Sequence, residues 1–120
     1  MRRVLLIDDE PDIRAVARVA IEVVAGWACD EAASGAEGLA AARAVKPDVV
    51  LIDMMMPGMD GVATAEAFRA DADCSSIPLL FLTANGPGGD PSWLVDGVIG
   101  KPFDPMTLGN VIAQKLGWAP

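Results

Sequence analysis

Residues 49–61 read VVLIDMMMPGMDG, an apolar run that ends on a carboxylate and is followed by a turn rich in Pro and Gly. A run of Val, Leu and Ile without polar alternation is typical of a strand buried on both faces of a parallel sheet. Ligands of open α/β sheets collect at the carboxyl ends of the strands, and Asp53 stands at such an end. The earlier run Val4–Ile7 ends in the same way, on Asp8 and Asp9. We therefore expect both strands to bring carboxylates to one edge of the sheet.

The composition restricts the class of protein. The chain has 120 residues, of which 52% are hydrophobic, and a formal net charge of −8. This length predicts one domain, residues 1–120, around a single core. The acidic charge argues against nucleic-acid binding by this domain, because neutralising phosphates needs clustered Lys and Arg. The chain contains no histidine, which excludes imidazole catalysis and histidine metal ligands.

The N-terminus and the cysteines bear on location. The start of the chain imitates a signal peptide, but its apolar run stops at Asp8, too early for such a segment. Nothing in the sequence approaches a membrane span, so we expect no membrane contact. Cys29 and Cys74 have neither metal-binding nor disulfide-framework spacing, and a cytoplasmic location is therefore expected.

Helical patterns separate the apolar runs. Apolar residues at helical spacing from Ile13 to Val24, including Val16, predict an amphipathic helix that Gly26 ends. Ser34 has the capping-box spacing to Glu37 and opens a second helix to about residue 45. Further helices are expected from residue 60 to about 70, capped by Asp60, and from Asp104-Pro105 onward, with residues 108, 111, 112 and 116 on one face.

Strands are expected between these helices, at residues 4–8, 27–32, 49–53, 77–83 and 98–99, with the second strand at an edge. Strands that alternate with helices at this spacing predict right-handed βαβ units and an α/β fold with a doubly wound parallel sheet. The segment between Thr83 and Lys101 departs from this regularity, since it is rich in Gly and Pro. Only residues 90–96 have room for a turn or two, so the fourth helix is expected to be shortened or replaced by a loop.

The ends of the expected strands carry a coherent set of groups: Asp8, Asp9, Asp53, Thr83 and Lys101. Clustered carboxylates repel one another and are costly to desolvate unless a cation neutralises them. Oxygen ligands without Cys or His favour a hard ion, Mg²⁺ first and Mn²⁺ as the alternative. A carboxylate nucleophile, Mg²⁺, a lysine and a hydroxyl together form what an aspartyl-phosphate site needs.

On these residues the chain resembles a response-regulator receiver domain of two-component signalling, of the CheY-like kind. The matching stretches span almost the whole sequence in the order and spacing of that family: residues 8–10, Asp53 with 56–61, 83–84 and 101–103. The resemblance implies a flavodoxin/CheY-like, five-stranded sheet with strand order 2-1-3-4-5.

The resemblance also implies a role for each matching residue. Asp53 is the implied phospho-acceptor. Asp9, Asp53 and the backbone carbonyl of Met55 are the implied Mg²⁺ ligands, with Asp8 assisting through water.

The same family pattern assigns the groups around the acceptor. Thr83, Ala84 and Lys101 are implied to bind and sense the phosphoryl oxygens, and the Lys101–Pro102 peptide bond is implied to be cis. Met55 and Asn85 are implied to tune the access of water and hence dephosphorylation. The implied partners are a sensor histidine kinase or a histidine phosphotransfer protein and a downstream protein that reads the phosphorylated state.

Two departures from the family pattern concern the output. Val98 stands where the family usually has an aromatic residue, so the usual exchange between Thr83 and a ring is not expected. The interval from Thr83 to Lys101 is also about one helical turn short. We therefore expect output through residues 85–93 or the first helix.

Other classes of protein remain as alternatives. A pseudo-receiver or scaffold would signal without phosphorylation. A Mg²⁺-dependent phosphatase would need an Asp-x-Asp motif, but Met55 occupies the second position. A flavin protein of the same topology would need a phosphate-binding loop after the first strand, where carboxylates stand instead. We expect no conventional enzyme, only phosphoryl uptake by the protein itself and slow autodephosphorylation.

Overall fold

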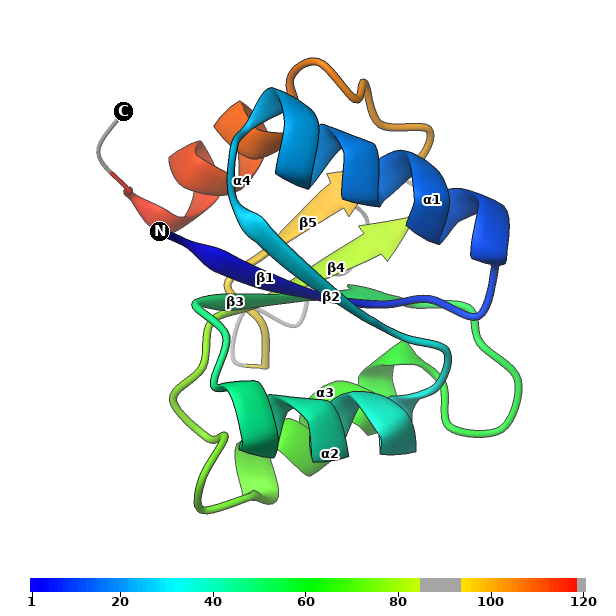
Figure 1. Cartoon of the computed structure of the whole chain (residues 1–120). Coiled ribbons are helices and arrows are strands. Elements are labelled where there is room, and N and C mark those ends of the chain that lie inside the picture. Colours follow the sequence, from blue (N-terminus) through cyan, green and yellow to red (C-terminus); the bar gives the residue numbers. More distant parts are fainter. Residues whose placement is uncertain (85–93, 119–120) are drawn as a thin grey trace.

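The computed structural model describes residues 1–84 and 94–118. Figure 1 shows the strands and helices of these residues. Their bounds are β1 Arg3–Ile7, α1 Pro11–Val19, η1 Ala20–Val24, β2 Ala28–Ala32, α2 Gly35–Val45, β3 Val49–Asp53, α3 Gly61–Ala70, β4 Leu79–Thr83, β5 Gly97–Gly100 and α4 Leu108–Leu116.

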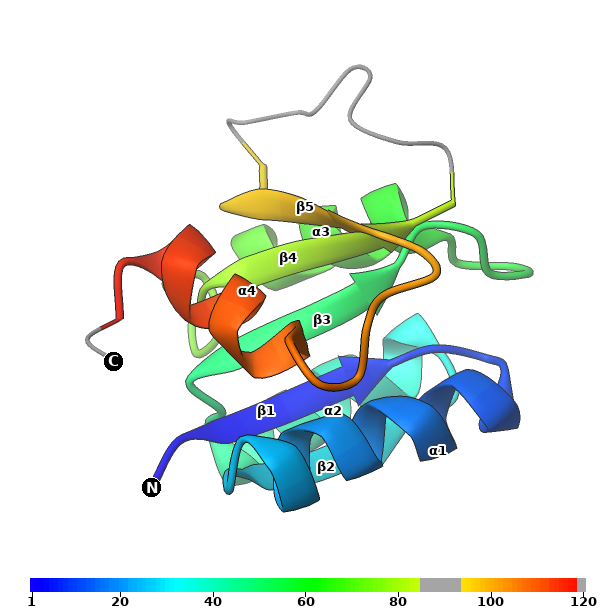
Figure 2. The same ribbon diagram turned by 90° about the horizontal axis from the view of Figure 1, so that it is seen from above.

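All strands of the sheet pair in parallel, in the order β2-β1-β3-β4-β5. This order and the α/β class confirm the predicted doubly wound sheet. The expected position of β2 at an edge is also correct, and β5 forms the other edge (Figure 2). β1 and β3 lie side by side near the middle of the sheet, in the register that pairs Ile7 with Ile52.

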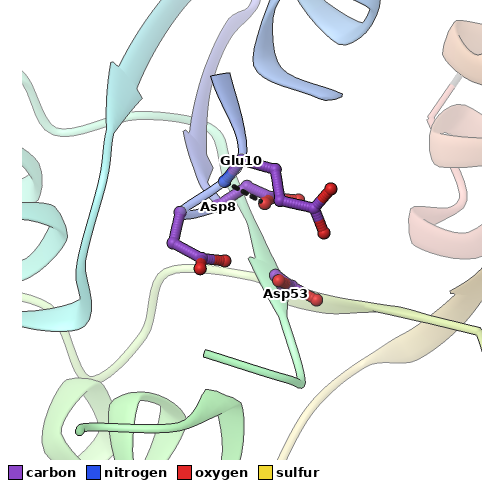
Figure 3. A group of neighbouring side chains, drawn as sticks. Asp8, Glu10 and Asp53 are labelled. Atoms are coloured by element: carbon purple, nitrogen blue, oxygen red, sulfur yellow. Dashed lines mark hydrogen bonds between the residues drawn. The ribbon is translucent and has the colours of Figure 1, made fainter. Parts of the chain in front are cut away.

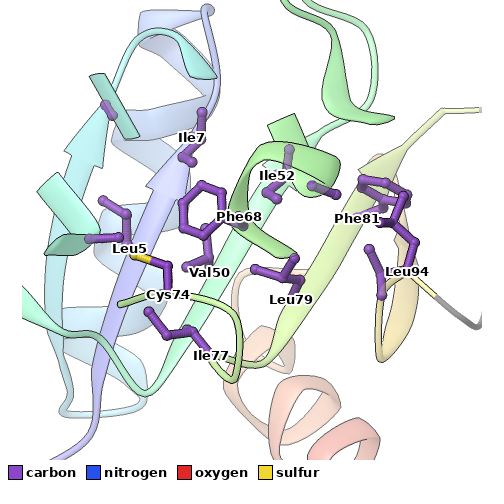
Figure 4. Close-up of a cluster of buried hydrophobic side chains, with 14 of the residues drawn as sticks. Leu5, Ile7, Val50, Ile52, Phe68, Cys74, Ile77, Leu79, Phe81 and Leu94 are labelled. Atoms are coloured by element: carbon purple, nitrogen blue, oxygen red, sulfur yellow. The ribbon is translucent and has the colours of Figure 1, made fainter. Parts of the chain in front are cut away.

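Helices cover the two faces of the sheet, α1, η1 and α4 on one side and α2 and α3 on the other (Figures 1 and 2). Each face has its own apolar cluster, because successive strand residues point in opposite directions. Leu5 and Ile7 of β1 pack with Phe68 of α3, as Figure 4 shows, whereas Val4 and Leu6 pack with the opposite helices. Every residue of β3 and β4 is buried, as the unbroken apolar runs predict.

Two predicted helix caps are present. The Ser34 hydroxyl accepts a hydrogen bond from the Glu37 amide at 3.2 Å, and the Asp60 carboxylate accepts one from the Ala63 amide at 2.9 Å. Each satisfies an amide that the first turn of a helix leaves without an intrahelical partner.

The first helix differs from its prediction. Its α-helical part ends at Val19 and continues as a π-helical segment, η1. Val16 and Val24 are 44% and 39% exposed, although the apolar spacing placed them with the packed residues. The small side chains of Ala17 and Ala20, both fully buried, let the helix axis approach the sheet. The packed stripe is therefore narrow and leaves the flanking valines outside.

Other element boundaries shift by a few residues. The last helix begins at Leu108, since the Asp104 carboxylate accepts a hydrogen bond from the Met106 amide at 2.9 Å and closes a turn before the helix. The fourth strand begins at Leu79, after Ile77 has bonded back to the carbonyl of Cys74.

The predicted change to the fourth helix falls mostly on residues 85–93, outside the described residues. Leu94–Asp96, which are described, are not helical. Within the described ranges, no helix is long and apolar enough to cross a membrane.

Candidate functional site

The carboxylates meet at the carboxyl ends of β1 and β3. Because Ile7 pairs with Ile52, the next residues along each strand, Asp8 and Asp53, stand next to each other at the edge of the sheet (Figure 3). Asp8 is fully buried and Asp53 is 3% exposed. Asp9 and Glu10 continue the chain from Asp8 toward α1, and one oxygen of each of these four carboxylates lies within 4.8 Å of the others.

Lys101 completes the cluster from the other side. β5 pairs with β4 so that Gly100 is opposite Thr83, and the Lys101 amide then donates to the Thr83 carbonyl at 2.8 Å. The Lys101 ammonium donates to Asp8 Oδ2 at 3.0 Å and to Asp53 Oδ1 at 3.1 Å. The Lys101–Pro102 peptide bond is cis, as the family resemblance implies.

Burial and charge act in opposite directions on Asp53. Desolvation raises the pKa of its carboxyl above the ordinary value, and the negative charge of Asp8 adds to this rise. Hydrogen bonds from Lys101 and from the Met55 amide, 3.2 Å from Oδ1, partly offset it. The pKa of Lys101 is also raised: burial lowers it, but the hydrogen bonds to Asp8 and Asp53 together outweigh burial.

The hydrogen bonds leave two buried carboxylate oxygens of the cluster available. Both oxygens of Asp8 have protein partners: Oδ1 accepts from the Glu10 amide at 2.9 Å (Figure 3), and Oδ2 accepts from Lys101. Asp9 Oδ1 and Asp53 Oδ2 are buried and have no hydrogen-bond partner among the residues that the structure describes. Buried charged oxygens without partners are costly, and a divalent cation between them would remove that cost. The donor set, all oxygen, fits Mg²⁺.

The other predicted residues lie around this cluster. Thr83 ends β4 and is 4% exposed, and Ala84 follows it at the surface. Met55 is 71% exposed and lines an open cavity of about 390 Å³ with Met54, Met56, Pro57 and Asp60. Asn85 lies outside the described residues. The structure therefore brings Asp8, Asp9, Asp53 and Lys101 into one cluster, with Thr83 at the end of the adjoining strand.

Glu10 is a member of the carboxylate cluster to which the sequence analysis gave no role. It precedes α1 and is exposed, unlike Asp8 and Asp53. The available signal was the run of three acidic residues immediately before Pro11.

Comparisons with known proteins bear on the family and the fold of the chain. Residues 4–113 match the family described as "Response regulator receiver domain". PilH of Pseudomonas aeruginosa is 36% identical over 120 residues, which cover 97% of this chain and 98% of PilH. The solved structure of the chemotaxis response regulator CheY4 of Vibrio cholerae superposes with a TM-score of 0.86 at 30% identity, covering 96% of this chain and 98% of that one.

Several relatives are longer. The DNA-binding dual master transcriptional regulator RpaA of Synechocystis sp. is 36% identical over 110 residues, which cover 87% of this chain and 44% of RpaA. The chain thus spans about half the length of the first curated relatives it matches, with 50% of Rre1 and 48% of PhoB covered. The matched family, the likeness to PilH over both full lengths and the shared sheet lead to one conclusion: this chain belongs to the response-regulator receiver family of two-component signalling.

Proposed function

We propose that the chain accepts a phosphoryl group on Asp53 and signals through protein contacts that depend on it. The observation that carries the proposal is the pairing of a buried carboxylate with a lysine: within the described part of the chain, Asp53 Oδ2 has no hydrogen-bond partner, while Oδ1 accepts a hydrogen bond from Lys101. A carboxylate fixed in this way is oriented for attack and keeps an oxygen free for a cation.

The donor is a phosphohistidine on a sensor kinase or a histidine phosphotransfer protein. A carboxylate oxygen of Asp53 forms a bond to phosphorus as the bond from phosphorus to the imidazole nitrogen breaks. The imidazole leaves with the electron pair and takes up a proton from solvent. Lys101, which carries a full positive charge beside Asp53, stabilises the negative charge that gathers on the phosphoryl oxygens.

Mg²⁺ fits the same cluster, through Asp9, Asp53 and the backbone carbonyl of Met55, with Asp8 acting through water. When bound, the ion supplies positive charge that neutralises the carboxylates and the incoming phosphoryl group. Asp8 is suited to the indirect role, because both its oxygens already accept hydrogen bonds. Thr83 and Ala84 stand at the end of β4, next to Lys101, where they would contact the phosphoryl oxygens.

The chain performs no other turnover in this proposal. Water slowly hydrolyses the aspartyl phosphate, and the exposed Met55 and the residue Asn85 control its access. Output does not use the usual exchange between a hydroxyl and a ring, because Val98 occupies the ring position. Its side chain is partly buried and borders, with Phe103 and Val111, an open cavity of about 250 Å³ between β5 and α4.

Intact-protein mass after incubation with acetyl phosphate and Mg²⁺ tests the proposal. We expect one added phosphoryl group in the wild type, none in Asp53→Asn, and none after chelation of the metal. Asp48→Asn is the matched control, because Asp48 is an exposed carboxylate immediately before Val49, the first residue of β3, whereas Asp53 is its last residue. An adduct that persists in Asp53→Asn would contradict the assigned acceptor.

A second donor separates the alternative function. If neither acetyl phosphate nor a phosphorylated histidine phosphotransfer protein modifies the wild type, the chain is a pseudo-receiver whose output is independent of phosphorylation.

A further inference from the structure

The carboxylate cluster depends on a short loop whose backbone is held by one residue of α1. Asp9 lies between two backbone carbonyls, those of Asp8 and Glu10. The Arg14 guanidinium donates from Nη1 to the Asp8 carbonyl at 2.6 Å, and the Arg14 amide donates to the Glu10 carbonyl at 3.1 Å. The Arg14 guanidinium therefore holds the peptide group that joins Asp8 to Asp9, and the Arg14 amide holds the carbonyl of Glu10, the residue after Asp9.

The reach of this side chain follows from helix geometry. Helical side chains point toward the N-terminus of their helix, so the first-turn side chain of Arg14 extends back over the loop that precedes Pro11. The Arg14 side chain is 18% exposed. A charged donor bound to a carbonyl at this distance and exposure makes a strong hydrogen bond, since little water competes for it.

Glu31 of the neighbouring strand β2 orients the guanidinium. Its carboxylate accepts from Arg14 Nε at 3.1 Å and, through its other oxygen, from Arg18 Nε at 2.5 Å. Arg18 also pairs with Glu22 at 2.8 Å. Glu31 neutralises the positive charge of Arg14, which would otherwise oppose a metal cation nearby. The planar guanidinium can hold the carboxylate and the carbonyl together in one fixed geometry, which a lysine ammonium cannot do.

We propose that Arg14 is a positioning residue for the metal site: by fixing the Asp8–Asp9 peptide it aims the Asp9 carboxylate at Asp53 and so sets the affinity for Mg²⁺. The proposal rests on the proposed function, since it requires that the cluster binds Mg²⁺. Asp9 itself supports it. Asp9 Oδ1 is buried and has no hydrogen-bond partner among the described residues, so side-chain hydrogen bonds do not hold it there, and its direction depends on the backbone that carries it, which the bond from Arg14 to the Asp8 carbonyl holds.

Two effects of Arg14 on Mg²⁺ affinity have opposite signs, and this makes the proposal testable. Removing a nearby positive charge strengthens cation binding. Releasing the loop weakens it, because the ligands must then be ordered by the ion. Substitution of residues that orient metal ligands typically reduces metal affinity about 10- to 100-fold. We expect the loss of positioning to dominate.

The experiment compares Arg14→Gln with Arg18→Gln by titrating each unphosphorylated protein with Mg²⁺ and following the shift in its thermal unfolding midpoint. The pair is matched: both residues lie on α1, both bind Glu31, and both substitutions remove one positive charge, but only Arg14 contacts the Asp8 carbonyl. We expect the Mg²⁺ dissociation constant to rise about 10-fold in Arg14→Gln and to stay within about twofold of wild type, or fall, in Arg18→Gln.

Equal affinities in the two variants, or tighter binding by Arg14→Gln, would overturn the positioning role. Arg14→Lys keeps the charge and the aliphatic stem and serves if the Gln variant does not fold; it is expected to bind Mg²⁺ more weakly than wild type, and wild-type affinity in it contradicts the proposal. If the wild type itself binds no Mg²⁺, the proposed function fails and this inference fails with it. If only the two Gln variants fail to differ, the positioning role alone is wrong.

Discussion

The ammonium of Lys101 lies 3.1 Å from Oδ1 of Asp53, although 48 residues separate the two in sequence. The contact exists because β3, β4 and β5 run parallel, so that Asp53, at the end of β3, and Lys101, just after β5, reach the same edge of the sheet. Lys101 also binds Asp8, and the two carboxylates therefore share one positive charge. The cluster keeps an excess of negative charge, which is the condition that favours a bound cation.

Lys101→Met is expected to slow phosphoryl uptake from acetyl phosphate on the order of 100-fold at saturating Mg²⁺. Methionine keeps the apolar stem but removes the charge that balances the phosphoryl oxygens. A mass time course measures the rate. Lys115→Met, at an exposed position of α4, should react at the wild-type rate. An unchanged rate in Lys101→Met would show that the lysine is only structural.

Asp53→Asn is expected to stabilise the metal-free protein at pH 7. Burial first of all raises the pKa of Asp53 above its ordinary value of 3.8, so the folded state favours the protonated carboxyl and its ionised form costs stability. Asparagine resembles the neutral carboxyl. Urea unfolding in the presence of a chelator should give the variant the higher midpoint at pH 7, and the difference should vanish as the pH falls below 3.8, where the wild-type carboxyl is protonated in both states. Saturating Mg²⁺ should reduce or reverse the order, since it stabilises only a protein that binds it.

Native Cys29 is expected to resist thiol reagents. Burial raises the pKa of its thiol to about 12, so roughly one molecule in ten thousand carries the reactive thiolate at pH 8. Ellman's reagent should modify neither Cys29 nor the buried Cys74 in the native protein and should modify both in urea. The unfolded thiol ionises near its ordinary pKa of 9.0, so stability should also fall as the pH rises above that value. Rapid reaction of one thiol in the native protein would contradict the buried placement.

Gly38→Ala is expected to lower the free energy of unfolding by about 1–3 kcal/mol. Alanine is the better helix former, but its Cβ would stand 2.2 Å from Cδ1 of Ile7, which is fully buried on the adjacent strand (Figure 4 shows Ile7). Gly100→Ala, where a Cβ meets nothing within 4 Å, should change stability by less than about 0.5 kcal/mol. Denaturant titrations compare the two. A stabilising Gly38→Ala would mean that helix propensity outweighs packing.

Most of the sheet could be predicted because its signals are local. Apolar runs that end on Asp8 and Asp53 fix both the strands and the edge where the carboxylates gather, and Ser34 and Asp60 mark helix starts through their own hydrogen bonds. Helix and strand boundaries that depend on tertiary packing were harder to predict from the sequence. The exposure of Val16 follows from how closely Ala17 approaches the sheet, and the spacing of apolar residues in the sequence does not predict that distance.

The same limit applies to the site. Lys101 could be assigned from its family motif, whereas the contact of Arg14 with the Asp8 carbonyl needed coordinates, because any helix of this kind has charged residues at similar positions. Glu10 is a related case, since its proximity to Asp53 depends on the path of the loop.

The pairing of Ile7 with Ile52 links the chemistry to the core more tightly than a list of residues suggests. The side chains of a strand alternate between the two faces of the sheet. A one-residue insertion within β1 would therefore move its core side chains to the opposite face and displace Asp8 from Asp53 at the same time. Substitutions, by contrast, can change Asp53 and leave every packed residue in place. In evolution, a descendant of this chain could therefore lose phosphoryl acceptance by point mutation and still fold, but changes of length within the central strands would be eliminated together with the fold.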